Sequence, residues 1–342
     1  MPKANSQISK EEVLHSRLKL FEATTAVFVV ISALLALLLL RPYLSLMLNG
    51  QPVGQRLTGI DTPLTSSQLS LLNNAPNSYF ETAGKMLLNL SLYGETTSNG
   101  IYTGAVSVQR MKNYTPLVIG GKPSVVYIGA ISCIYCAENR WAMALALTRF
   151  GNFTALYNGY SSFGDYDVPT LYWTHDNYTS NGTVSYGGHY SSKYINFFPA
   201  EYVSKVSGGF TFVNSANPIA YFVQEAPNQS YRQAMSFMNA SGSFAGTPFT
   251  FWGVALNSGA DAVVFGTSTN QSAKYPPLSY MTHAQIIGQL GAFNTTFATQ
   301  EYAAADVYVA ETCPAIGNSA PVCSLPAIVD LEAMMGLLPS PK

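Results

Sequence analysis

The sequence predicts an α/β fold in which a strand delivers two cysteines to the start of a helix. The cysteines form the motif Cys133-Ile-Tyr-Cys136, which follows the apolar run Ser124-Val-Val-Tyr-Ile-Gly-Ala130. A helix-like stretch rich in Ala, Leu and Met comes next, from Ala137 to Arg149. The third observation is Gly246-Thr-Pro-Phe-Thr-Phe-Trp-Gly253, an aromatic strand led by a proline. A strand, a Cys-x-x-Cys pair and a helix in this order are typical of thioredoxin-like redox proteins.

The cysteine pair has a physical reason to lie at a helix start. Unsatisfied N–H groups give a helix N-terminus partial positive charge, so a thiolate is stabilised there. The short spacing lets Cys136 resolve a mixed disulfide that Cys133 has formed. These two residues are therefore the predicted catalytic pair, although a permanent disulfide, half of a zinc site or two buried thiols would give the same pattern.

Thr247 and Pro248 form the predicted substrate-binding loop. In a thioredoxin fold, a cis X-Pro bond opposite the cysteines exposes the backbone of the preceding residue, with which an extended substrate can pair. Proline is also common at strand starts. The segment supports a substrate-binding loop only together with the upstream cysteines and with the strand expected at Ala262-Val-Val-Phe265.

The other expected elements follow hydrophobic periodicity and cap signals. The first helix is expected to have a serine cap, and a Tyr/Asn/Gly/Ser-rich loop is expected over 174–192. Its His175 and His189 have no further ligand at zinc-like spacing, so no metal site is expected. Trp141 is expected in the core, and Arg140 could orient a thiolate or pair with an acid. Helices are predicted over 66–73, 79–92, 231–238, 282–290 and 299–308, and strands over 168–173 and 194–198.

A second cysteine pair, Cys313 and Cys323, lies near the C-terminus. Outside the cell, such a small loop is most simply a structural disulfide, worth about a few kcal/mol at most. The alternatives are a redox relay to the first pair or a zinc site with four cysteines, although the two pairs lack a zinc-ribbon arrangement. No cofactor is expected.

An apolar block near the N-terminus predicts a transmembrane helix over 21–44. Ala23 to Leu40 contains no charged residue, and roughly 20 apolar residues cross a bilayer as a helix. Four basic residues precede the block and only Arg41 follows it closely, which favours a cytoplasmic N-terminus. A cleaved signal peptide is the alternative, but the run is long and no small-x-small site follows. The sequence therefore predicts a single-pass cell-membrane protein whose C-terminal domain is extracellular.

The composition agrees with an extracellular location. Charged residues make up 10% of the chain, against roughly 25% in soluble proteins. A surface poor in charge suits acid, because few carboxylates lose stabilising interactions on protonation. The net charge of −1 and the lack of a basic stripe argue against nucleic-acid binding. Glycosylation candidates in Asn-x-Ser/Thr sequons are Asn89, Asn113, Asn152, Asn177, Asn181, Asn228, Asn239, Asn270 and Asn294.

The block from Gly121 to Ala130, the motif Cys133-x-x-Cys136-Ala-Glu-Asn-Arg140-Trp141 and the segment Arg149-Phe-Gly151 resemble a family of archaeal membrane-anchored proteins of unknown function. That family is known from thermoacidophiles and has a thioredoxin-like fold. Val168-Pro-Thr170 and the C-terminal cysteines fit the same pattern. The resemblance implies the fold, the anchor and the outside location.

A looser similarity to extracytoplasmic thiol–disulfide oxidoreductases implies the roles of single residues. It makes Cys133 the nucleophile, Cys136 the resolving thiol and Pro248 the cis-proline, with Thr247 as its recognition residue. The chain departs from that pattern in three ways. The distance from Cys136 to Pro248 requires a long insertion, Ser132 stands where tryptophan is often found, and no acid lies in the preceding strand.

The predicted architecture is a thioredoxin-like central sheet with flanking helices and a long insertion, preceded by one transmembrane helix. Two functions fit it. One is a thiol–disulfide oxidoreductase or isomerase that acts on cysteine-containing surface proteins; the other is a glycosylated cell-envelope structural or binding protein with inert disulfides, whose loops over 161–192 make contacts. The expected segments are a cytoplasmic N-terminus (1–20), anchor (21–44), linker (45–63), helical extension (64–120), extracellular domain (121–330) and tail (331–342).

Overall fold

The computed structural model divides the chain into two units, residues 1–50 and residues 51–342. Within the predicted anchor it describes Thr25 and Ser32, so the anchor otherwise lies outside the described residues. No helix in the described part of the chain is long and apolar enough to cross a membrane. In the second unit the described residues are 59–89, 96–97, 100–101, 117–161, 167–175, 184–202, 222–224, 226–240, 249–252, 254–256, 259–261, 278 and 281–337.

The main sheet is built around β4 (Lys122–Ala130), the strand that leads to the cysteine motif. β10 (Asn196–Tyr202) pairs parallel to one edge of β4, and β11 (Phe249–Trp252) pairs antiparallel to the other. β8 (Val184–Tyr186) lies beyond β10, and the short β3 (Val118–Ile119) folds back on β4. The order is β11-β4-β10-β8. β4 is buried from residue 124 onward, as expected for a strand covered on both faces.

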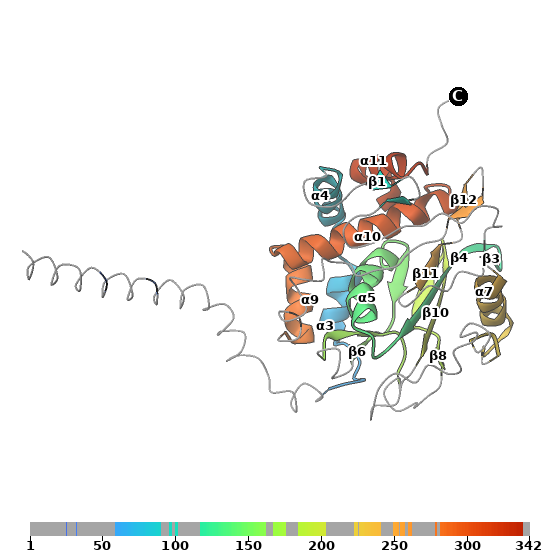
Figure 1. Cartoon of the computed structure of the whole chain (residues 1–342), viewed down its shortest axis with the longest axis horizontal. Helices are drawn as coiled ribbons and strands as arrows, with labels where there is room; N and C mark the ends of the chain where they lie inside the picture. The colour runs from blue at the N-terminus through green and yellow to red at the C-terminus, as the bar shows by residue number, and fades with distance from the viewer. Residues whose placement is uncertain are drawn as a thin grey trace, which may run out of the picture. The chain divides into compact units, whose positions relative to one another are not determined.

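Helices cover both faces of this sheet, which makes the fold mixed α/β (Figure 1). α5 (Ile134–Leu147) follows β4 directly, and α10 (Thr296–Ala315) packs on α5. α7 (Gln229–Ala240) lies on the opposite side of the sheet. The crossover from β4 through α5 to the parallel β10 holds the cysteine motif at the end of a central strand.

α10 is the centre of the helical layer and is buried along most of its length. α4 (Asn77–Leu88) and α11 (Pro326–Met334) pack against α10 and against each other. α9 (His283–Ala292) also packs on α10, and α3 (Ser66–Asn73) lies on α9. The predicted helix over 299–308 is thus longer than expected, because apolar contacts on several sides support the extra turns.

The loop expected over 174–192 contains two strands, β8 and β9 (Tyr190–Ser192), so that expectation was wrong for its second half. The strand predicted over 168–173 exists as β7 (Pro169–Tyr172), but it pairs with β6 (Tyr157–Tyr160) rather than joining the main sheet. β5 (Gly151–Phe153) pairs with β9 in the same way. The remaining two-stranded pairs are β1 (Thr96–Thr97) with β2 (Gly100–Ile101) and β12 (Val254–Leu256) with β13 (Gly259–Asp261).

Side-chain caps define several helix starts. α3 begins at the predicted residue, but its cap is Thr65 rather than a serine, with a capping box to Gln68. α9 has the same arrangement between Thr282 and Gln285. α5 begins three residues earlier than predicted, because Cys133 itself occupies the N-cap position.

Candidate functional site

Cys133 and Cys136 lie at the junction of β4 and α5, as predicted. Cys133 is the N-cap of α5, and its Sγ accepts a hydrogen bond from the Cys136 backbone N–H at 3.5 Å. The Cys136 Sγ accepts a hydrogen bond from the Ala130 N–H at 3.4 Å. Both residues are present as thiols. Each sulfur therefore receives a backbone donor, and each donor would stabilise a thiolate.

The motif is nearly closed to solvent. Cys133 is 5% exposed and Cys136 is 0% exposed, whereas Tyr135 between them is 37% exposed. Burial raises the pKa of Cys136 well above its ordinary value, and the hydrogen bond and charge of Cys133 raise it further. Arg140 and the Ala130 N–H act in the opposite direction. Cys136 is thus hard to ionise in its resting state.

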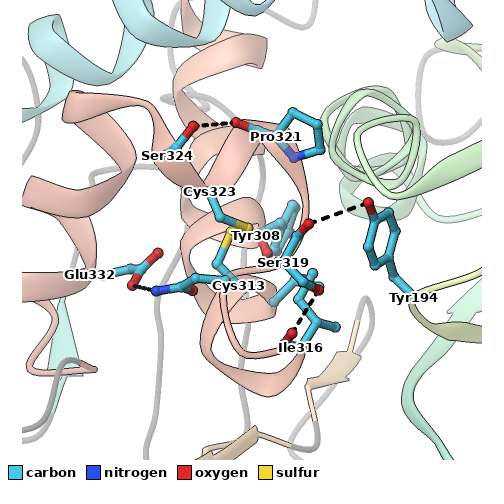
Figure 2. Close-up of a disulfide and its surroundings, with 11 residues drawn as sticks. Tyr194, Tyr308, Cys313, Ile316, Ser319, Pro321, Cys323, Ser324 and Glu332 are labelled. Carbon is cyan, nitrogen blue, oxygen red and sulfur yellow. Dashed lines mark hydrogen bonds between the residues drawn. A yellow bond between two sulfur atoms is a disulfide. The ribbon is translucent and has the colours of Figure 1, made fainter.

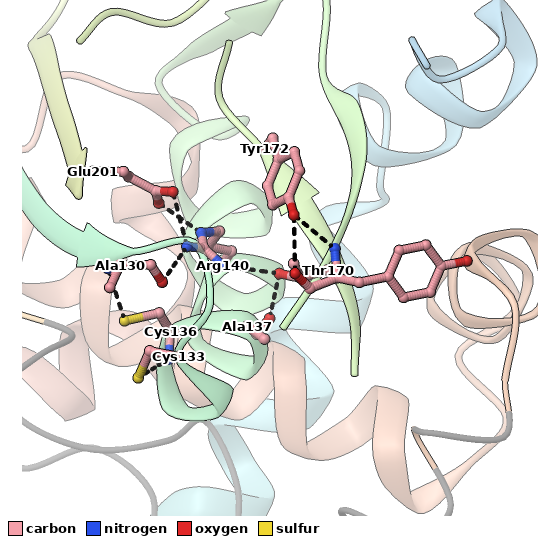
Figure 3. Close-up of polar contacts among 9 residues, drawn as sticks. Ala130, Cys133, Cys136, Ala137, Arg140, Thr170, Tyr172 and Glu201 are labelled. Carbon is pink, nitrogen blue, oxygen red and sulfur yellow. Dashed lines mark hydrogen bonds and ion pairs between the residues drawn. The ribbon is translucent and has the colours of Figure 1, made fainter. Parts of the chain in front are cut away.

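Arg140 and Glu201 form a buried ion pair next to the motif, here called the charged layer (Figure 3). Arg140 lies one turn after Cys136 on α5 and is completely buried. Its Nε and Nη2 donate to the two carboxylate oxygens of Glu201 on β10, at 2.6 and 2.8 Å. Nη2 also donates to the Ala130 carbonyl at 3.0 Å. Of the two sequence hypotheses for Arg140, pairing with an acid is the one that the structure shows.

Thr170 fixes the far side of the guanidinium. Its Oγ1 donates to the Ala137 carbonyl at 2.6 Å and accepts a 3.4 Å hydrogen bond from Nη1 of Arg140. Burial alone would lower the pKa of Arg140, but the Glu201 carboxylate raises it above its ordinary value. The guanidinium is therefore a permanent positive charge in a dry environment.

Tyr127 on β4 adds a second buried polar group near the motif. Its hydroxyl has no hydrogen-bond partner among the described residues. Burial raises the pKa of Tyr127 well above its ordinary value, so the phenol stays neutral. The charges of Arg140, Glu201 and both cysteines all influence it, which indicates that these groups share one electrostatic environment.

Trp141 is completely buried, as predicted, and its indole N–H donates to the Pro169 carbonyl at 3.1 Å. Beside it, His283 at the start of α9 has its Nε2 at 2.8 Å from the carbonyls of both Gly159 and Thr170. Burial lowers the pKa of His283 to about 4. These contacts tie α5 and α9 to the β6–β7 hairpin, and so they hold the helix that carries the cysteines.

The predicted disulfide between Cys313 and Cys323 is present (Figure 2). It joins the last turn of α10 to the short helix η3 (Pro321–Ser324), with a Cα–Cα distance of 5.5 Å. Both cysteines are buried. Within the intervening loop, Asn318 donates to the Glu332 carboxylate on α11 at 3.2 Å. The bond therefore clips α10 to the segment that leads into α11.

The predicted substrate loop, Thr247 and Pro248, lies outside the described residues. β11 begins at the next residue, Phe249, which pairs with Ile128 on β4. The strand therefore starts near the end of β4 that carries the cysteines. The segment predicted as a strand, Ala262 to Phe265, also lies outside the described part of the chain.

Four glycosylation candidates, Asn89, Asn152, Asn228 and Asn294, are exposed. Asn239 lies in α7, and its side chain is outside the described part; Asn113, Asn177, Asn181 and Asn270 are outside it altogether.

His189 contacts Tyr157 through a 3.3 Å hydrogen bond, and His175 packs against the same ring. In the described part of the chain no group of three or more His, Cys, Asp or Glu residues could hold a metal ion.

Glu201 is the residue that reasoning from sequence missed. β4 contains no acid, as expected, but the neighbouring strand supplies one. The signal was available: Glu201 is the one charge in the apolar run from Phe197 to Tyr202, and Arg140 is the one cation in an apolar helix. Glu138 is also buried in α5, but opposite charges in neighbouring buried elements are expected to pair.

Comparison with known families gives a match to a domain of unknown function. Residues 109–241 match a family model described as a domain of unknown function, DUF929. The matched region includes both cysteines of the motif, Arg140 and Glu201, and it ends before β11 and the disulfide. Searches of curated proteins and of solved structures give no significant match. The findings thus relate this segment to a DUF929 domain of unknown function with a Cys-x-x-Cys pair at a helix start.

Proposed function

We propose that this protein is a thioredoxin-like thiol–disulfide oxidoreductase, anchored in the cell membrane by residues 21–44 and acting on cysteine-containing proteins outside the cell. The order of elements supports the fold: β4, α5 and the parallel β10 form a βαβ unit, and β11 lies antiparallel on the other edge of β4. The observation that carries the activity is Cys133 at the N-cap of α5 with its sulfur accepting the Cys136 N–H.

The proposed chemistry has two thiol-exchange steps. The Cys133 thiolate attacks a client disulfide, forms a mixed disulfide with one client sulfur and releases the other as a thiolate. Cys136 then attacks Cys133, so the Cys133–Cys136 bond forms and the second client sulfur leaves. The client disulfide gains two electrons, and the pair loses them. Run in reverse, the same steps oxidise a client dithiol.

A second function is favoured by one observation, the burial of the cysteine pair. An exposed thiol of low pKa is typical of a redox catalyst, whereas buried thiols are usually inert. The alternative is a glycosylated cell-envelope protein that uses the same scaffold with unreactive cysteines. Under the first proposal, side chains around Cys133 must move before a client sulfur reaches it.

Titration in defined thiol redox buffers separates these functions. The ectodomain from residue 51, which is one compact unit, is equilibrated, alkylated and analysed by mass spectrometry for each pair. We expect the Cys133–Cys136 pair to have a reduction potential above about −250 mV. The Cys313–Cys323 disulfide should have one below about −300 mV and therefore stay oxidised in these buffers. Reduction potentials below about −300 mV for both pairs would support the envelope protein instead.

Trapping in cells tests the activity directly. A Cys136→Ala variant cannot resolve the mixed disulfide, so client proteins should accumulate on Cys133. The matched control is Cys133→Ala, which lacks the nucleophile and should trap none. Absence of any client on the first variant would contradict the proposed oxidoreductase.

A further inference from the structure

We propose that Arg140 is a positioning residue that compensates the negative charge of the Cys136 thiolate during client release, and that Glu201 holds Arg140 in place rather than accepting the Cys136 proton. This inference rests on the proposed function and concerns its second chemical step. It assigns a cation, not a carboxylate base, to the layer behind the motif.

The geometry places the cation close to the sulfur. Arg140 lies four residues after Cys136, and residues with this spacing share one face of a helix. Ala130 contacts both groups: its N–H donates to the Cys136 Sγ at 3.4 Å, and its carbonyl accepts from Arg140 at 3.0 Å. Figure 3 shows the guanidinium between this end of β4 and Glu201. The cation and the sulfur are thus held by the same residue.

Glu201 is poorly suited to act as the base. Both of its carboxylate oxygens accept hydrogen bonds from Arg140. Taking a proton would break a bidentate pair in a dry site and leave the guanidinium without its counter-ion. With the pair intact, the charge of Arg140 acts against burial on the pKa of Cys136 and lowers it, so the guanidinium favours the thiolate that this step creates.

The release step then balances without a protein base. After the side chains around Cys133 have moved to admit the client, the proton of Cys136 leaves to solvent, and the thiolate attacks the Cys133 sulfur of the mixed disulfide. The Cys133–Cys136 bond forms as the bond to the client sulfur breaks. The client thiolate departs with the electron pair of the broken bond and takes up a proton from water. Arg140 keeps its proton and its charge throughout.

Two substitutions should shift the titration of Cys136 in opposite directions. In a Cys133→Ser background, thiolate absorbance is measured against pH and corrected with the Cys133→Ser/Cys136→Ser protein. Adding Glu201→Gln removes the counter-anion, and we expect a thiolate fraction about tenfold higher at a given pH in the titration range. Adding Arg140→Gln removes the cation, and we expect a fraction about tenfold lower.

Thr170→Val is the matched control. It deletes the hydrogen bonds to Ala137 and Arg140 while Arg140 keeps its charge and its pair with Glu201, so any shift should be much smaller than those of the two charge substitutions. A purely structural role predicts no opposite shifts. If Glu201→Gln and Arg140→Gln move the titration in the same direction, or leave it unchanged, the inference is overturned. If Arg140→Gln does not fold, the sign of the Glu201→Gln shift decides by itself.

A single-turnover measurement links the titration to release. A mixed disulfide between Cys133 and a nitrothiobenzoate thiol is formed, and release of the coloured thiol is followed against pH. Arg140→Gln should slow release about tenfold at a given pH. Failure of the wild-type protein to release the thiol would contradict the proposed function, whereas the absorbance titration still decides the role of Arg140.

Discussion

The start of α5 and the helical layer of α4, α10 and α11 both contain buried charge and a cysteine pair, but they treat the charge differently. Behind the thiols, Glu201 is compensated by Arg140. In the helical layer, neither carboxylate oxygen of Asp306 has a hydrogen-bond partner among the described residues. Burial and the nearby Glu81 raise the pKa of Asp306 well above its ordinary value. The first region keeps its ion pair, whereas Asp306 in the second stays neutral by holding a proton.

The two regions are therefore stable over different ranges of pH. A compensated ion pair persists over the ordinary pH range. A buried carboxyl without a counter-ion is compatible with the fold only while it is protonated. The helical layer is also the region that the disulfide clips, since Cys313 lies on α10 and the loop after it contacts Glu332 on α11.

The largest expected effect is removal of the disulfide. Cys313→Ala/Cys323→Ala should lower the free energy of unfolding by about 3 kcal/mol, because the unfolded chain gains the entropy of an open loop. The matched variant Cys133→Ala/Cys136→Ala removes thiols without a cross-link and should lower it less. Urea unfolding measures both. Equal losses would mean that the two pairs do not differ in structural role.

A smaller effect is expected where the helices pack most closely. A Cβ on Gly84 of α4 would lie 2.8 Å from the Ala327 Cβ and 3.1 Å from an oxygen of Asp306. Gly84→Ala should therefore destabilise the protein by about 1–3 kcal/mol through overpacking. Gly288 on α9 is exposed, and a Cβ added there would meet no neighbouring atom within 4 Å, so Gly288→Ala should stabilise by up to about 1 kcal/mol. Thermal unfolding of the two variants should shift in opposite directions.

The smallest expected effect is a dependence of the free energy of unfolding on pH. Burial raises the pKa of Glu332 to about 7. The folded state then holds a proton that the unfolded chain loses above its ordinary pKa of about 4.3. Stability should therefore fall as pH rises from about 4 to 7, by at most about 1.4 kcal/mol per pH unit for this group. Asp306 contributes with the same sign.

Glu332→Gln should flatten that slope, because the amide needs no proton to stay neutral. Asp330→Asn removes one carboxylate from the exposed face of α11 and is the matched control for the change in net charge. Urea unfolding at several pH values is the measurement. A free energy of unfolding that rises with pH over this range in the wild-type protein would refute the protonated state of Glu332 and Asp306.

Local signals in the sequence predicted the cysteine motif, its strand and helix, and the C-terminal disulfide. They did so because a β-branched run, an Ala- and Leu-rich run and a close cysteine pair each act over a few residues. The start of α5 was missed because cysteine is not a common N-cap residue. β8 and β9 were missed because a Tyr- and Asn-rich segment becomes a strand only when a distant partner pairs with it.

The charged layer could not be deduced in the same way. Arg140 and Glu201 are 61 residues apart in the chain, and only the parallel pairing of β4 with β10 brings them together. A charged residue in an apolar element indicates that a buried partner exists but does not identify it. The register of the sheet, which pairs Glu201 with Gly129, places Glu201 beside the end of β4 and so identifies the partner.

The parallel pairing of β4 and β10 also determines how the chain must be oxidised. Ser124 pairs with Asn196, 72 positions away, so this contact forms slowly compared with a local loop. Four cysteines allow three pairings, and the two incorrect ones join residues that are about 180 positions apart. Until the sheet closes and buries Cys133 and Cys136, both can react with Cys313 and Cys323. An oxidant added after collapse should therefore give more native protein than one present from the start of refolding.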